Sequence, residues 1–270
     1  MVLLAFPLPP PETPRPSAVA APDRAAEPAG FAVGSPPADA WLRGGLARGA
    51  LHEVVAAAGA DAPAAAGFAL GLAARAGGEG PILWIRDGRA AAEAGRVDGM
   101  GLLEFGAGPA RVILVQPDRS DDALWAADAG ARCPGLGAVL LETGGRPLGL
   151  TATRRLALGL RASGTTLILL RGGPPMPSAA MTRWRVASAL SRALEANAPG
   201  HQAVSVTLVR HRAGIAERTW QMEWDRDRQR FAERAPLPGA VVPLPADGPD
   251  PARGMPADGF AARRVEGRSG

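Results

Sequence analysis

The sequence contains no lysine and no tyrosine, so all 30 of its basic residues are arginine. The missing lysine excludes two mechanisms within this chain. A phosphate-binding loop of the Walker A type uses a lysine on the β- and γ-phosphates, and a Schiff-base enzyme needs a reactive lysine amine. A GC-rich genome would account for the composition, since alanine, glycine, proline and arginine are abundant. The chemical consequence is the same whatever the cause.

Cysteine and histidine are also scarce. The single cysteine, Cys133, excludes an intrachain disulfide and a multi-thiolate metal site, and it fits a reducing cytoplasm. His52, His201 and His211 lack the spacing of a zinc motif, so we expect no metal and no other cofactor. No apolar run reaches the ~18 residues of a membrane span. The net charge of +4 permits contact with nucleic acid without requiring it.

Proline divides the chain into three parts. Residues 1–40 hold ten prolines and residues 235–270 hold seven, with little periodicity in either, so both are expected to be disordered tails. The tails are either plain linkers or carriers of short segments that order on binding, for which 241–245 and 260–264 have the hydrophobic content. We expect residues 41–234 to form one folded domain.

Short apolar runs alternate with helical patterns in the first part of this domain. Five runs predict buried strands: 51–55, 81–86, 111–115, 137–142 and 165–171. Three segments predict helices: 64–76, 120–131 and 151–162. Three later segments alternate between apolar and polar residues and predict half-exposed strands: 183–190, 204–209 and 219–224. The expected fold class is therefore α/β, with a mostly parallel sheet flanked by helices and an extension of antiparallel strands at its C-terminal end.

The order of these elements, and several of their residues, resemble the RecA fold and more closely the ImuA family, which are RecA-like proteins encoded in bacterial SOS mutagenesis cassettes. The resemblance covers about residues 46–225. Five segments carry it: Gly49–Val54, Leu83–Arg86, Ala123–Ala127, Leu150–Leu156 and Ser178–Val186. Each segment is weak by itself, and it is their order and spacing that make the match specific.

The sequence departs from RecA at each part of the ATP site. Residues 56–66 stand where RecA has its phosphate loop, but they contain one glycine, no lysine and no serine or threonine for magnesium. Asp61 would add negative charge where phosphate should bind. Alignment puts Gly88 in the place of the catalytic glutamate that the resemblance implies, with Asp87 beside it. Glu142 ends the strand in the Walker B position, where it is either a remnant of the site or a polar strand end. We therefore expect a degenerate phosphate loop and no ATP hydrolysis.

Residues 143–150 and 172–179 stand where RecA has its two DNA-binding loops. Both are short, the second is rich in proline and lacks a basic residue, and Arg146 is the only cation of the first. DNA binding of the RecA type is therefore not expected, and a direct contact with DNA stays open.

Arginine is concentrated late in the domain, because residues 183–234 hold ten arginines against six acidic residues. Six arginines are our candidates for a partner-binding surface: Arg154, Arg155, Arg183, Arg185, Arg210 and Arg212. Such a surface would bind an acidic partner or phosphates. The alternative is a solvated face with arginine–carboxylate pairs. Trp184, Trp220 and Trp224 lie on apolar strand faces, which favours core packing over base stacking, and His52 is expected to be structural.

The resemblance implies a non-catalytic RecA-like adaptor of the SOS response to DNA damage, which supports translesion synthesis and damage-induced mutagenesis. The implied partners are ImuB, a polymerase-like protein of the Y family that lacks catalysis, and an error-prone C-family DNA polymerase. A contact with RecA itself is also compatible with the fold. Such a protein would be cytoplasmic, and nucleoid-associated when acting. Two alternatives stay open. One is a SulA-like inhibitor of cell division that acts on FtsZ. The other is a divergent ATPase that holds phosphates through arginine and backbone amides, although residues 56–66 contain no arginine.

Overall fold

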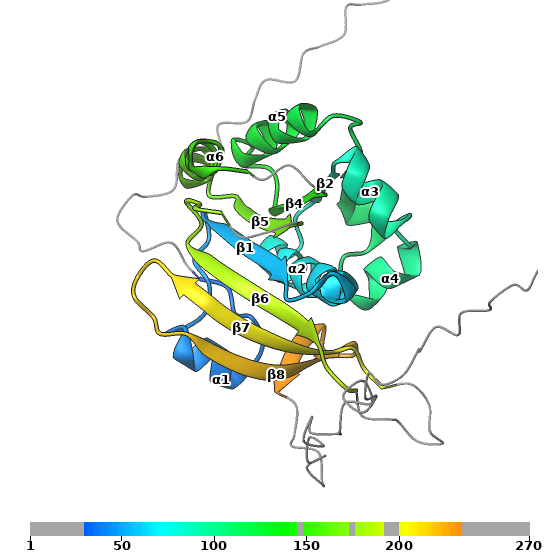
Figure 1. Ribbon diagram of the computed structural model, residues 1–270, viewed down its shortest axis with the longest axis vertical. Coiled ribbons are helices and arrows are strands. Elements are labelled where there is room, and N and C mark those ends of the chain that lie inside the picture. The colour runs from blue at the N-terminus through cyan, green and yellow to red at the C-terminus, as the bar shows by residue number, and fades with distance from the viewer. Residues whose placement is uncertain (1–29, 145–147, 173–175, 192–199, 234–270) are drawn as a thin grey trace, which may run out of the picture. The chain divides into compact units, whose positions relative to one another are not determined.

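A computed structural model of the chain describes residues 30–144, 148–172, 176–191 and 200–233 (Figure 1). These residues form one nine-stranded mixed sheet with helices on its faces. The order of the strands across the sheet is β3-β2-β4-β5-β1-β6-β7-β8-β9. The strands from β3 to β6 pair in parallel, and those from β6 to β9 pair antiparallel. The expected fold class, a mostly parallel α/β sheet with antiparallel strands at its C-terminal end, is confirmed.

The boundaries of the elements are as follows. The parallel strands are β1 (Leu51–Ala56), β2 (Ile82–Arg86), β3 (Val112–Val115), β4 (Ala138–Thr143), β5 (Thr166–Arg171) and β6 (Thr182–Ser188). The antiparallel strands are β7 (Ala203–His211), β8 (Arg218–Asp225) and β9 (Arg230–Glu233). The helices are α1 (Pro36–Trp41), α2 (Ala62–Gly77), α3 (Gly88–Ala94), α4 (Gly99–Glu104), α5 (Ser120–Ala131) and α6 (Leu150–Ser163). None of the described helices is both long and apolar enough to cross a membrane.

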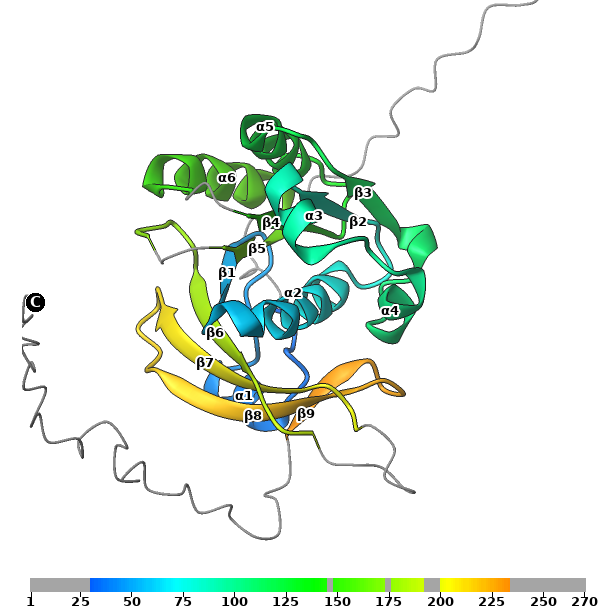
Figure 2. The ribbon, with the colours of Figure 1, turned by 45° about the vertical axis from the view of Figure 1, so that its right-hand side comes forward.

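The helices cover both faces of the parallel strands. Helices α5 and α6 lie on one face and α2 lies on the other (Figures 1 and 2). All six residues of β4 are buried, because its side chains alternate between two covered faces. Leu141 packs with Leu156 of α6, whereas Leu140 packs in the other core with Phe68 of α2. The sequence of these strands contains continuous apolar runs because a hydrophobic core covers each of the two faces of the sheet.

The antiparallel strands curl around α2, and their tryptophans fill the space between. Trp184, Trp220 and Trp224 are at most 4% exposed. The ring of Phe68 lies 5.8 Å from that of Trp184 and 5.0 Å from that of Phe231, measured between centroids. The expectation that these tryptophans pack in the core is confirmed.

The N-terminal boundary of the domain was predicted too late. Residues 30–40, expected to belong to a disordered tail, are part of the fold. Phe31 and Leu46 exchange two backbone hydrogen bonds of 2.8 and 2.9 Å, and Val33 is fully buried. The proline count misled the prediction because Pro36 and Pro37 begin α1, where the missing amide hydrogen of proline leaves no helical hydrogen bond unmade. Residues 1–29 and 234–270, with the segments 241–245 and 260–264, lie outside the described residues.

Asp39 holds this N-terminal segment. Its carboxylate accepts hydrogen bonds from the backbone amides of Val33 (2.6 Å) and Gly34 (3.0 Å). We expect Asp39→Ala to lower the free energy of unfolding by about 1–2 kcal/mol, because two backbone donors lose a charged acceptor. Denaturant titration followed by circular dichroism measures this, with exposed Asp227 as the matched control. If Asp39→Ala and Asp227→Ala gave equal stability, the segment would not contribute to the fold as described.

His52 is structural, as expected. It is fully buried on β1. Its Nδ1 lies 2.8 Å from the hydroxyl of Thr182, which also accepts a hydrogen bond from the indole of Trp184 (2.8 Å). Its Nε2 lies 2.9 Å from the carbonyl of Ala47. The consistent assignment is that Thr182 donates to Nδ1 and Nε2 donates to Ala47, so the ring is neutral with both nitrogens satisfied.

Burial lowers the pKa of His52 to about 4, against the opposing effect of the Ala47 carbonyl. As the pH falls from 6.5 towards 4, the unfolded chain therefore binds a proton at this residue that the folded chain does not bind. The resulting loss of unfolding free energy is about 3 kcal/mol by pH 4. Denaturant titrations at pH 7 and pH 4.5 should show a smaller loss in a His52→Asn variant, which does not titrate. Equal losses in the two proteins would show that His52 is charged in the folded state.

Candidate functional site

Strands β1, β2, β4 and β5 end at the same edge of the sheet, and a crevice of about 1370 Å³ opens there. It is lined by residues of the loop 56–63 that follows β1, by residues of α3 and α4, and by the ends of β4 and β5. Open parallel sheets commonly bind ligands outside the carboxyl ends of their strands. The resemblance to RecA would put a nucleotide in this crevice, so its charged groups decide what it can hold.

The loop that follows β1 is tied down by a carboxylate. One oxygen of Asp61 accepts a hydrogen bond from the amide of Ser188 (2.8 Å), at the end of β6, and the other accepts one from the amide of Ala58 (3.0 Å). The amide of Ala57 donates to Val186 of β6 (2.8 Å). The hydrogen bond from Ser188 is the main reason that the pKa of Asp61 lies below its ordinary value. Asp61 therefore holds the loop against β6, and it is not one of the residues that line the crevice.

Glu142, at the end of β4, is held by two side chains of the neighbouring strand β2. Arg86 Nε donates to its carboxylate at 2.8 Å and the indole of Trp84 donates at 3.2 Å. The ion pair is buried, with side-chain exposures of 3% for Arg86 and 9% for Glu142. Arg86 also donates to the carbonyl of Gly95 at 2.7 Å. A carboxylate bound in this way cannot bind magnesium or take a proton from water without breaking a buried ion pair.

Asp87, the acid nearest the place of the expected catalytic glutamate, is also engaged. It is 1% exposed. Its carboxylate caps α3 by accepting from the amide of Ala90 (2.8 Å), and it accepts from the amide of Gly144 beyond β4 (3.0 Å). Gly88 begins α3 and offers no side chain. The Asp87 side chain therefore joins the ends of β2 and β4.

Besides Glu142, the acids that line the crevice are Glu93 and Asp98, and both have partners. Glu93 accepts from Arg89 at 2.8 Å, and Asp98 caps α4 through the amide of Gly101 at 2.8 Å. In the part of the chain that the structure describes, no group of three or more histidine, cysteine or acidic residues could hold a metal ion.

Three of the six candidate arginines lie around a buried carboxylate, that of Glu53 on β1. Glu53 has zero exposure and accepts from Arg171 (2.5 Å), Arg183 (2.8 Å) and the hydroxyl of Ser178 (2.8 Å). Arg210 donates to the carbonyls of Ser178 and Ala180, both at 3.1 Å. Arg212 donates to the carbonyl of Ala179 at 3.3 Å. Burial, and secondly the charge of Arg183, lower the pKa of Arg210.

These contacts give Arg183, Arg210 and Arg212 a structural task, which is to hold the segment 176–181 between β5 and β6. Glu53 and Arg171, which form the centre of this cluster, were not among the predicted site residues. A signal was present, since Glu53 and Arg171 are charged residues within or at the end of otherwise apolar strands. Arg146, the single cation of the first expected loop, lies outside the described residues.

The other three candidates are exposed, as Arg212 is, whereas Arg183 and Arg210 are half-buried. Arg155 of α6 makes a two-pronged ion pair with Asp128 of α5, with distances of 3.1 and 2.7 Å. The hydrogen bond from Arg155 is the main reason that the pKa of Asp128 lies below its usual value. Arg185 lies 3.9 Å from Glu217, and its side chain is 52% exposed. Arg154 is exposed on α6.

No family model matches this chain, and no curated protein matches it significantly. The resemblance to the ImuA family therefore rests on the five sequence segments and remains a prediction.

Proposed function

We propose that the protein is a non-catalytic RecA-like adaptor of the ImuA type, which acts in the SOS response. It would support translesion synthesis and damage-induced mutagenesis together with an ImuB-like Y-family subunit and an error-prone C-family polymerase. The observation that best supports a non-catalytic role is the buried pair of Arg86 and Glu142. This pair uses the one carboxylate that the resemblance would assign to magnesium. Each of the three acids that line the crevice is paired with an arginine or caps a helix, which supports a binding module rather than a hydrolase.

The absence of ATP turnover is the first testable consequence. The purified full-length protein should show no saturable hydrolysis of ATP with magnesium, and Glu142→Gln should give the same background rate, because Glu142 is already paired with Arg86. Phosphate release measured over a range of ATP concentrations tests this. Saturable turnover in the wild type that disappears in Glu142→Gln would favour the divergent ATPase.

Partner recovery tests the adaptor role directly. The tagged protein, purified from cells exposed to a DNA-damaging agent, should retain the Y-family-like subunit and the error-prone polymerase, identified by mass spectrometry. Deletion of the gene should abolish damage-induced mutation and leave cell division normal. Recovery of the tubulin-like division protein instead, with filamentous cells on overexpression, would favour the SulA-like alternative.

A further inference from the structure

Helices α5 and α6 lie side by side and turn a common outer surface to the solvent (Figures 1 and 2). The Asp128–Arg155 pair and a 2.7 Å hydrogen bond from Ser163 to the carbonyl of Ala131 join the two helices. On their outer surface Trp125 is 71% exposed and Leu158 is 66% exposed. The next most exposed tryptophan of the chain, Trp41, is 37% exposed. Exposed large apolar side chains in one region are typical of an interaction site.

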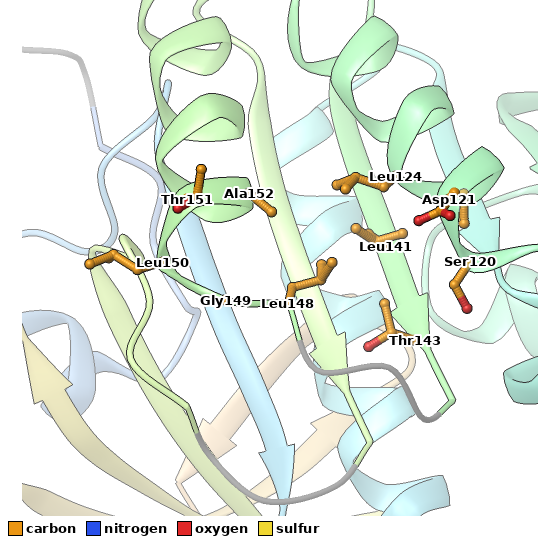
Figure 3. Close-up of a pocket in the computed structure, with 11 residues that line it drawn as sticks. Ser120, Asp121, Leu124, Leu141, Thr143, Leu148, Gly149, Leu150, Thr151 and Ala152 are labelled. Atoms are coloured by element: carbon orange, nitrogen blue, oxygen red, sulfur yellow. The ribbon is translucent and has the colours of Figure 1, made fainter.

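A pocket of about 260 Å³ opens beside this surface, between the first turns of the two helices (Figure 3). Figure 3 shows Leu124 of α5, Leu141 of β4 and Leu148 directed into the space between the helices. Ser120 and Thr151 add hydroxyl groups to its lining, and Asp121 adds a carboxylate at the first turn of α5. An apolar cavity of about 150 Å³ accommodates benzene, so this pocket is large enough for one aliphatic or aromatic side chain. Interfaces are commonly anchored by such a side chain in a pocket.

The charge of α6 completes the surface. Between Leu150 and Ser163 the helix carries three arginines and no acidic residue. Arg155 is paired with Asp128. Arg154 and Arg161 are exposed, and no carboxylate of the described residues forms an ion pair with either. With Leu158 they follow the spacing i, i+4 and i+7, so the two cations flank an exposed leucine on one side of the helix.

We propose that this outer surface, defined by Trp125, Arg154, Leu158, Arg161 and the adjacent pocket, binds a segment of a partner protein that carries acidic residues around an apolar anchor. The inference rests on the proposed adaptor function, for which it names the docking surface. Charge complementarity selects this occupant. A second copy that docked α6 against α6 would bring arginines against arginines. The segment 260–264 of the chain itself, with its two arginines, has the same sign.

Photo-crosslinking tests this surface in the full-length protein. A photoreactive amino acid replaces Trp125 in one strain and Leu190 in a control strain, because both side chains are 71% exposed. Damaged cells are irradiated, and the crosslinked peptide is sequenced by mass spectrometry. We expect position 125 to crosslink one protein at a segment with acidic and apolar residues. The double variant Arg154→Glu/Arg161→Glu should lower this yield about tenfold, because both arginines lose their contact with the acidic segment. A tenfold loss corresponds to about 1.4 kcal/mol of binding free energy.

The control for the charge reversal is Arg226→Glu in the turn that follows β8, where the arginine is 49% exposed and pairs with Glu104; it should leave the yield unchanged. Several outcomes overturn the docking surface: no crosslink from position 125, a crosslink to a second copy or to the chain's own residues 234–270, or a yield that the double reversal does not change. Co-purification with the unmodified chain separates this inference from the proposed function. If the polymerase subunits bind but never crosslink to position 125, the function stands and the surface is wrong. A charge-dependent crosslink to an acidic segment of some other protein supports the surface and contradicts the function.

Discussion

Replacing Glu53 with glutamine is expected to lower the free energy of unfolding by about 3–5 kcal/mol. Glu53 has no exposed surface, and its carboxylate binds Arg171, which is itself 1% exposed, and Arg183, which is 14% exposed. Glutamine has the same shape but no charge, so both guanidinium groups would stay buried without a counter-ion. Removing one partner of a buried ion pair costs much more than the pair contributes as a whole.

Urea titration followed by circular dichroism measures this change. The matched control is Glu93→Gln, since Glu93 also pairs with an arginine but is 58% exposed, and we expect that variant to unfold as the wild type does. A Glu53→Gln protein that differed from the control by less than about 1 kcal/mol would mean that Arg171 finds other compensation.

The second large effect concerns the pair in the crevice. Arg86→Met leaves Glu142 buried with only the indole of Trp84, and we expect it to cost about 3–5 kcal/mol. The double variant Arg86→Met/Glu142→Leu removes both charges together. It should recover most of that loss, because well-packed apolar residues often replace a buried ion pair without destabilisation. Denaturant titration of the two single variants and the double variant gives the coupling between the two side chains.

The double variant also separates stability from function. If the crevice has no catalytic task, Arg86→Met/Glu142→Leu should co-purify with the same partners as the wild type. The single Arg86→Met variant at reduced growth temperature is the control for loss of fold. A stable double variant that lost its partners would show that the charges of the crevice take part in binding.

The fold class was predictable because strands that are buried on both faces appear in the sequence as continuous apolar runs. The run at 137–142 predicts β4 nearly residue for residue, since a strand with two covered faces has no polar positions. The same criterion fails for the run at 111–115. This run forms β3, which is an edge strand and not a buried one, and Ile113 and Leu114 are 49% and 41% exposed. An apolar run predicts a strand, but whether that strand is central or at the edge depends on which other strands it pairs with.

The candidate site was less predictable, because its groups meet through the pairing of distant strands. Arg86 and Glu142 are neighbours through the register of β2 with β4, which no local pattern encodes. The short helices α3 and α4 were not predicted either, and they follow the caps Asp87 and Asp98 with glycine in their first turns. Three candidate arginines proved to hold the backbone around Ser178, since a guanidinium group serves a carbonyl or a carboxylate of its own chain as well as one of a partner.

The order of the strands also sets a delay during synthesis. Strand β1 lies between β5 and β6. Its buried Glu53 binds Arg171 at the end of β5, and these two residues are 118 positions apart in the chain. At ~5–20 residues per second, roughly 6–24 s pass between the translation of the two. For that time β1 has no native neighbour on either side, and the apolar side of α2 has no completed sheet to cover. The nascent chain therefore exposes apolar surface of β1 and α2 until β5 and β6 have left the ribosome.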